Sequence, residues 1–236
     1  RAHHLDHRDA GFATELTYGT LRSQGTYDAI LAHCADRPLE KIGTTTLVVL
    51  RMGVHQLLSM RVPAHAALNQ SVALARAQIG GGPANFVNAV LRRVSERSRE
   101  EWYARLEADA KDDTEKLALA KSHPIWIVRS MRQALAAHGR SPAEIQELLE
   151  ADNQAPVVNL IALPGVGNLQ EAFEKGAVEG ELVEDSALYS AGDLGRLESV
   201  REGTVRAQDV GSQLVTRALV AAPLEGQDSA WLDLCA

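Results

Sequence analysis

The sequence predicts a multidomain chain of the α then α/β class, with helices in its first half and strands only after Pro156. Through residues 1–121, apolar side chains recur at the three-to-four residue spacing of helices that bury one face. After Pro156 the pattern changes to short apolar runs rich in β-branched residues, which favour strands. Only 4% of the 236 residues are aromatic, so we expect an aliphatic, alanine-rich core.

Successive apolar stripes indicate helices in the first hundred residues. The first helix is expected to continue from Asp9 and to end at Gly25, and the fourth to be closed by Gly80–Pro83. The expected inward faces are, in order, Phe12, Leu16 and Thr20; Tyr27, Ile30, Leu31 and Cys34; Leu47, Leu50, Val54, Leu57 and Leu58; Leu68, Val72, Ala75 and Ile79; and Phe86, Val87, Val90, Leu91 and Val94.

The second half is expected to hold a helix pair followed by a small α/β unit. Pro124 suits the first turn of a helix, and Ser141–Glu144 has the spacing of a capping box. Beyond them we expect strands near residues 157–163, 181–183 and 204–207, a short helix at 169–175, a helix at 208–220 with Leu214, Ala218 and Leu219 inward, and a last strand at 230–236.

Charge is distributed unevenly along the chain. The formal net charge is -7, yet residues 1–99 carry 12 Lys and Arg against 7 Asp and Glu, a balance of +5. A basic front on an acidic body is compatible with an RNA-facing first domain, and an uneven solvated surface explains it equally well. No apolar run is long enough to span a membrane, and the two cysteines are expected to be free thiols in a reducing, cytoplasmic setting.

Individual candidates mostly have an ordinary structural interpretation. Cys34 lies on an apolar helix face and is expected to be a small core residue. Gly80–Pro83 lacks the Lys-Ser/Thr of a phosphate loop and is expected to be a connection. His65 is expected to serve local capping, and no metal site is assigned because the terminal histidines (His3, His4 and His7) have no companions at ligand spacing.

Four arginines are the candidate RNA contacts. Arginine pairs bidentately with phosphate, and the candidates are Arg22, Arg92, Arg93 and Arg97, although exposed helix faces account for them equally well. Replacing Arg22, Arg92 and Arg93 by alanine is expected to lower the salt slope of RNA binding by about 2 to 3 with little loss of helix stability.

Three segments resemble a known family. Residues 9–22, DAGFATELTYGTLR, look like the opening helix of NusB-type domains, and residues 62–72 and 86–93 resemble its later helices. These segments occur together in the Fmu/Sun type of RNA cytosine-5 methyltransferase. Residues 122–124 and 151–153 resemble the connector of that family, and residues 208–215 and 231–236 resemble the start of its catalytic fold.

The resemblance implies four parts. They are a NusB-like RNA-binding helical domain at 1–121, a helical connector at 122–155, a small α/β subdomain at 156–207, and the start of a Rossmann-like methyltransferase domain at 208–236. It also implies S-adenosylmethionine as cofactor and RNA, specifically 16S ribosomal RNA, as substrate.

The resemblance assigns few site residues. Cys235 and Ala236 match the edge of the cofactor site, where the family continues into a glycine-rich turn. In that family a thiolate attacks carbon 6 of cytosine and a second cysteine assists release. Both cysteines belong to later motifs, so no catalytic residue is assigned, and we expect a part of a longer enzyme that is inactive alone.

Two other functions compete with this hypothesis. A stand-alone NusB-like module for transcription antitermination or ribosomal RNA processing would leave the connector, the α/β unit and residues 231–235 without a use. A helical protein–protein adaptor would leave the order of the three front segments unexplained.

Overall fold

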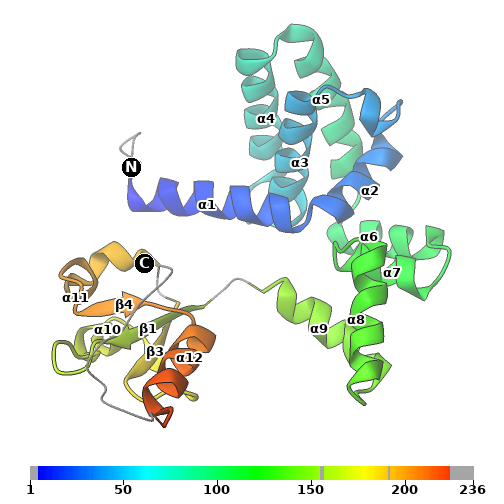
Figure 1. Cartoon of the computed structure of the whole chain (residues 1–236). Coiled ribbons are helices and arrows are strands. Elements are labelled where there is room, and N and C mark those ends of the chain that lie inside the picture. The colour runs from blue at the N-terminus through cyan, green and yellow to red at the C-terminus, as the bar shows by residue number, and fades with distance from the viewer. Residues whose placement is uncertain (1–4, 155–156, 191, 224–236) are drawn as a thin grey trace. The chain divides into compact units, whose positions relative to one another are not determined.

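The computed structural model describes residues 5–154, 157–190 and 192–223. The chain divides into two units, residues 1–154 and 155–236, of which the first is helical and the second holds a small sheet (Figure 1). Within the described residues, strands begin only after Pro156, which confirms the expected order of structure. No described helix is long and apolar enough to cross a membrane.

Six described helices build the main bundle of the first unit. They are α1 (His7–Arg22), α2 (Gln24–Cys34), α3 (Thr44–Leu58), α4 (Ala64–Gln78), α5 (Gly81–Ser95) and α6 (Arg99–Asp109). Leu31, Leu50 and Leu91 are fully buried in its core. Helices α3 and α5 approach closely at Gly53, where a Cβ atom would lie 2.5 Å from Leu91 Cδ1. The inward face expected for α5 is confirmed, since Val87, Val90, Leu91 and Val94 are all buried.

Helix boundaries in the bundle differ from expectation at two glycine positions. Helix α1 ends at Arg22, and Gly25 lies in the first turn of α2, because Ser122 Oγ accepts the Gly25 amide at 3.0 Å. Gly80–Pro83 does not merely connect two helices. Gly80 has φ +130° and precedes α5, whose first turn contains Pro83, a residue that needs no helical N–H partner there.

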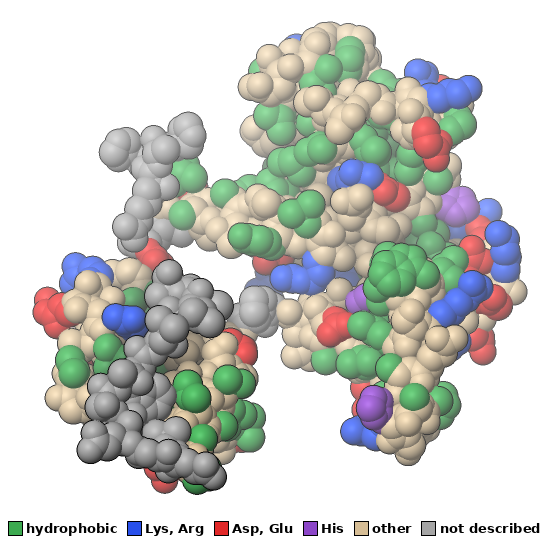
Figure 2. Space-filling model, in the orientation of Figure 1, with side chains coloured by type: hydrophobic (Ala, Val, Ile, Leu, Met, Phe, Trp, Pro, Cys, Tyr) green, Lys and Arg blue, Asp and Glu red, His purple; other side chains and the backbone are tan. Residues whose placement is uncertain are grey.

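Helix α1 is only partly covered. Phe12, expected inward, is 43% exposed, and Leu21 is 60% exposed, whereas Thr20 is buried as expected. Figure 2 shows hydrophobic side chains exposed along this helix. An apolar stripe therefore predicted the helix but not the extent of its burial.

Three further helices complete the first unit beside a small core of their own. They are α7 (Asp113–Ala120), α8 (Ile125–Ala137) and α9 (Ile145–Asp152), and Val128 and Leu149 are fully buried between them. The predicted capping box is confirmed: Ser141 and Glu144 cap each other's backbone around a single 3-10 turn, Pro142–Glu144, that leads into α9.

The second unit is a small antiparallel sheet with short helices. Its strands are β1 (Val158–Ala162), β2 (Val178–Glu179), β3 (Ser186–Tyr189) and β4 (Val205–Ala207), in the order β2-β3-β1-β4. Its helices are α10 (Gln170–Glu174), α11 (Glu198–Arg201) and α12 (Val210–Ala221). Leu160, Ala172, Ala187 and Leu197 are fully buried at its core.

Two expectations for this unit are wrong, and one lies outside the described residues. Residues 181–183 form a bend between β2 and β3, because Asp185, with φ +55°, turns the chain before β3 begins. Leu214 and Leu219 are 43% and 58% exposed, and Ala218 is exposed too, so the apolar face of α12 has no partner among the described residues. The strand expected at 230–236 falls outside the described residues.

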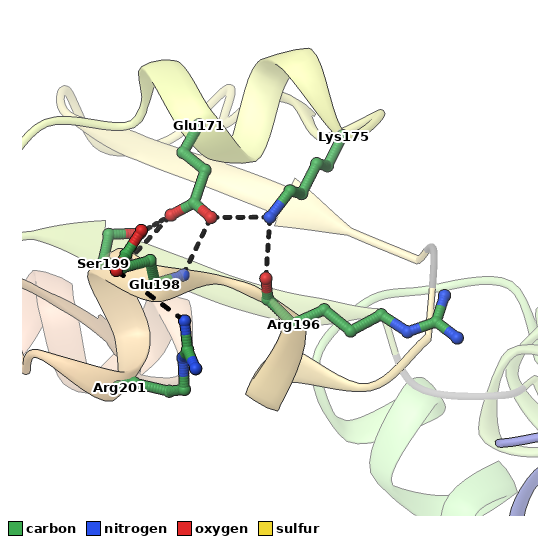
Figure 3. A network of polar contacts seen from close by, with 6 residues as sticks. All are labelled: Glu171, Lys175, Arg196, Glu198, Ser199 and Arg201. Carbon is green, nitrogen blue, oxygen red and sulfur yellow. Dashed lines mark hydrogen bonds and ion pairs between the residues drawn. The ribbon is translucent and has the colours of Figure 1, made fainter. Parts of the chain in front are cut away.

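A polar network fixes α10 against α11 (Figure 3). The Glu171 carboxylate accepts hydrogen bonds from the amides of Glu198 (2.8 Å) and Ser199 (2.9 Å), the Ser199 hydroxyl (2.7 Å) and Lys175 Nζ (2.6 Å). Lys175 Nζ also donates to the carbonyl of Arg196 at 2.7 Å. Lys175 first, and then the amides, hold the pKa of Glu171 well below its ordinary value of 4.5. The network is a structural clamp, because the Glu171 carboxylate, Lys175 Nζ and the Ser199 hydroxyl are all paired within it.

Candidate nucleic-acid interface

A polar cavity of about 400 Å³ opens in the first unit where the bundle meets the connecting helices. We call it the junction cavity. Its cationic lining residues are Arg22 at the end of α1, Arg99 at the start of α6, and Lys121 after α7, and its acidic ones are Glu15 and Glu150. Within the described residues Arg22 makes no hydrogen bond or ion pair, whereas Lys121 is paired with Glu150. Arg22 and Arg99 are therefore the cations available to a ligand.

The position of Arg22 depends on how α1 docks on α3. Gly19, one turn earlier, lies against the ring of His55, and a Cβ atom there would be 2.3 Å from the ring. The ring is itself fixed, because His55 Nδ1 hydrogen-bonds to the Tyr27 hydroxyl at 2.7 Å, which also contacts Ser59 Oγ at 2.8 Å. Gly19 thus allows the close approach that places Arg22 at the cavity.

Burial determines the protonation states of His55 and Tyr27. His55 is 3% exposed, and desolvation lowers the pKa of its imidazole from the ordinary value of 6.5, although Glu15 Oε1, 3.5 Å from Nε2, opposes the effect. Arg22 lowers the pKa of His55 further. Burial also raises the pKa of Tyr27 above 10.0. The His55–Tyr27 pair is therefore neutral in the folded protein at neutral pH.

We expect His55 to make the first unit sensitive to acid. In the unfolded chain His55 binds a proton near pH 6.5, whereas the buried imidazole stays neutral because its pKa is lowered. The contribution of neutral His55 to the free energy of unfolding is therefore fully present above pH 6.5 and is lost as the pH falls below it. For this single proton, the free energy of unfolding changes by at most about 1.4 kcal/mol per pH unit. Urea unfolding at several pH values should show that slope in the parent chain and a shallower one in His55→Gln.

The matched control is His65→Gln. His65 is exposed and makes no side-chain hydrogen bond among the described residues, so its replacement should leave the slope unchanged. Equal slopes in the parent and His55→Gln would contradict the assignment. The capping role expected for His65 is wrong, because no side-chain hydrogen bond caps the start of α4.

The far wall of the junction cavity is held by Ser122. This residue has φ +55°, and its Oγ accepts hydrogen bonds from the amides of Gly25 (3.0 Å) and Thr26 (3.3 Å) at the start of α2. Asn153 Nδ2 donates to the carbonyl of Lys121 at 2.6 Å. The connecting helices are thereby tied to the bundle through the segment that the sequence analysis singled out at 122–124.

Arg97 lies beside a second cavity that shares one residue with the first. This cavity has a volume of about 410 Å³ and is lined by both Arg97 and Arg99. The guanidinium of Arg97 lies 5.2 Å from the ring centre of Trp102, and that of Arg99 lies 5.3 Å from the ring centre of Tyr103. Arg22, Arg99 and Arg97 therefore line two cavities linked through Arg99.

The other two candidate arginines are engaged differently. Arg92 Nε donates to Asn88 Oδ1 at 3.3 Å, and Arg93 Nη1 donates to the carbonyl of Cys34 at 2.7 Å. Neither lines the two cavities. Because Arg93 ties α5 to the end of α2, its replacement by alanine is expected to lower the stability of the bundle. The sequence-based expectation of little loss of stability therefore does not hold for this arginine.

Of the remaining candidate residues, one lies in the core of the bundle and the others lie outside the described residues. Cys34 is 2% exposed within the bundle core, and burial raises the pKa of its thiol to about 11, which confirms it as a core residue. Cys235 and Ala236, like His3 and His4, lie outside the described residues. Sequence reasoning missed Arg99 and Lys121, and the only signal for Arg99 was its place after Ser98, in the capping box that Ser98 forms with Glu101.

The front of the chain matches a known protein family, since residues 1–96 match the NusB family. The crystal structure of PH0851 superposes on 87% of this chain and 46% of its own, with a TM-score of 0.67 and 13% sequence identity. At that identity the similarity concerns the fold alone.

Relatives with names extend the similarity over nearly the whole chain. Rv1407 of Mycobacterium tuberculosis, named as a methyltransferase, is 42% identical over 97% of this chain. Proteins named ribosomal RNA small subunit methyltransferase B are 26% identical over 93% of the chain in Pseudomonas putida and 29% identical over 97% in Escherichia fergusonii. The chain spans about half the length of these relatives, namely 50%, 49% and 51%.

Proposed function

Because the chain carries a NusB domain and is homologous to ribosomal RNA small subunit methyltransferase B, we propose that it is the N-terminal part of an S-adenosylmethionine-dependent RNA cytosine-5 methyltransferase. Its substrate in this proposal is 16S ribosomal RNA, and the front domain binds that RNA. The observation that carries the proposal is the extent of the homology, which covers at least 93% of the chain in all three relatives.

The described residues do not form the cofactor site of such an enzyme. A Rossmann-like site lies at the carboxyl ends of parallel strands beside a glycine-rich turn, whereas every described strand pairing is antiparallel. The proposal places the edge of the cofactor site at Cys235 and Ala236, which lie outside the described residues.

The exposed face of α12 supports a domain that starts near residue 208. The core of the second unit extends from Leu160 to Val205, and Gln213 is the buried residue among those described in α12. The apolar side chains left exposed on this helix are Leu214, Val215, Leu219 and Val220. Such a face belongs to a helix that packs in a larger domain. This supports the boundary proposed at 207/208, and the division of the chain after residue 154 supports the one proposed at 155/156. The further boundary in the proposed division 1–121, 122–155, 156–207 and 208–236, at 121/122, stays a prediction.

A stand-alone NusB-like module is the second candidate function. A module of that kind would need only the bundle, whose family match ends at residue 96. The homology continues through the connecting helices and the second unit in each of the three relatives. The methyltransferase is therefore the better supported function.

Methylation mapping tests the proposal directly. In cells that express the gene, a cytosine of 16S ribosomal RNA should resist bisulfite deamination, because methylation at carbon 5 protects it. Disruption of the gene should remove that protection, and the restored gene should return it. An unchanged bisulfite pattern across 16S ribosomal RNA after disruption would refute the substrate and the reaction together.

A further inference from the structure

A separate pocket lies where two helices of the bundle begin. It has a volume of about 310 Å³ and is lined by residues that include Arg37, Lys41, Gly43, Thr46, Gly82 and Phe86. We call it the Lys41 pocket. It shares no lining residue with the junction cavity or with the cavity beside Arg97. It is therefore a distinct feature of the first unit.

Both helices reach this pocket without a side-chain cap. The residues that precede them are Gly43 before α3 and Gly80 before α5, and neither helix start carries a side-chain hydrogen bond. Each helix has 15 residues, and its first-turn amides have no partner inside the helix. Because the helix dipole adds partial positive charge at such an end, an anion is the favoured ligand.

Thr46 gives an independent indication of a ligand. Its residue is 8% exposed, it lines the pocket, and its hydroxyl makes no hydrogen bond within the described residues. In α1, by contrast, the hydroxyls of Thr14 and Thr17 bond to carbonyls four residues earlier, at 2.8 and 2.7 Å. The Thr46 hydroxyl is not among the buried side-chain atoms that lack a partner, so it can be reached from the pocket, and an acceptor bound there would take its hydrogen bond.

The charged side chains around the pocket include two cations. Lys41 makes no ion pair among the described residues. Arg37 lies with its guanidinium 4.8 Å from the ring centre of Phe86, and its Nε donates to Asp36 at 2.9 Å. Glu40 is exposed nearby in sequence. Lys41 is thus the cation free to neutralise a ligand, with Arg37 held beside it.

The glycine run at 80–83 lies at this pocket, in addition to connecting α4 to α5. Gly80–Pro83 lacks a neighbouring Lys and Thr, and for that reason it did not match a phosphate loop. The fold brings Lys41 and Thr46 from another segment to the same pocket as Gly82. The polar groups that a phosphate loop contributes locally are here supplied by two helix starts.

We propose that the Lys41 pocket binds a phosphate group of the RNA substrate. Amides at the two helix starts, the Thr46 hydroxyl and the Lys41 ammonium would donate to the phosphate oxygens, which are strong acceptors. The choice of RNA as the source of the phosphate rests on the proposed function. The site would fix the RNA backbone at a point separate from Arg22 and Arg99.

Amide chemical shifts of the 236-residue chain test the site. Inorganic phosphate, added at constant ionic strength against sodium chloride, should shift the amides of Thr44–Thr46, Gly81 and Gly82. The double variant Lys41→Ala, Thr46→Val should bind phosphate about tenfold more weakly, the loss expected for charge-assisted hydrogen bonds. The control is Lys111→Ala, Thr17→Val, since both of these side chains are exposed and neither lines the pocket. It should match the parent.

The same proteins then distinguish the sources of phosphate. Binding to a 16S ribosomal RNA fragment should weaken in the double variant and not in the control. Shifts that persist unchanged in the double variant would overturn the site. Lost phosphate binding with undiminished RNA affinity would overturn RNA as the ligand and assign the pocket to a small phosphate compound. Phosphate binding in a parent chain that binds no RNA would instead refute the RNA-binding role of the front domain, and the RNA assignment of this pocket with it.

Discussion

Replacing Arg22 and Arg99 together by alanine is expected to flatten the salt dependence of RNA binding. The two arginines line the junction cavity from α1 and α6, and neither is in an ion pair among the described residues. Each phosphate they neutralise releases counterions and adds about 0.7 to the slope on single strands and about 0.9 on duplexes. The double variant should therefore lower the slope by about 1.4 to 1.8. Binding of a 16S ribosomal RNA fragment across a salt series measures it.

The control for this experiment removes equal charge elsewhere on the bundle. Arg61 and Arg76 are exposed and line neither cavity, so Arg61→Ala, Arg76→Ala should keep the parental slope. Circular dichroism should show unchanged helix content in both variants. If the two variants lowered the slope equally, RNA binding would depend on overall charge and the junction cavity would not be its site.

The substitution Gly19→Ala is expected to destabilise the first unit strongly. Its new Cβ atom would lie 2.3 Å from two atoms of the His55 ring, and the ring cannot turn away because Tyr27 holds it. Overpacking of this kind costs about 1 to 3 kcal/mol even though alanine is the better helix former. Urea unfolding should show a lower midpoint, and RNA affinity should fall as well, because α1 carries Arg22 only three residues later.

A second glycine of the same helix provides the matched control. No atom lies within 4 Å of the position that a Cβ would take at Gly11, so Gly11→Ala should stabilise the helix by up to about 1 kcal/mol. Truncating the ring in His55→Ala should also remove the penalty of Gly19→Ala. Equal effects at Gly11 and Gly19, or a penalty that survives without the ring, would show that the close contact does not control docking of α1.

Several parts of this protein were determined by local sequence alone. The stripe of Val87, Val90, Leu91 and Val94 predicted both a helix and its buried face, because the 3.6-residue period and the burial of one side belong to the same segment. The capping box of Ser141 and Glu144 was equally local. The change to β-branched residues after Pro156 located the sheet. The segments at 9–22, 62–72 and 86–93 carried the NusB resemblance, which the family match confirmed.

Only the tertiary structure decided which distant side chains share a site. Arg22, Arg97 and Arg99 line two cavities that share Arg99, through the packing of α1 and α6 in the bundle. The sequence pattern predicted that Arg93 is exposed in the same way, but its guanidinium donates to the carbonyl of Cys34. Thr46, in the first turn of α3, and Lys41, just before that helix, reach Gly82 through the packing of α3 beside α5. The apolar face of α12 shows the same limit, since its pattern predicted an inward face and could not say whether a partner covers it. A periodic pattern reports what one segment prefers, and which groups meet depends on contacts between segments far apart in the chain.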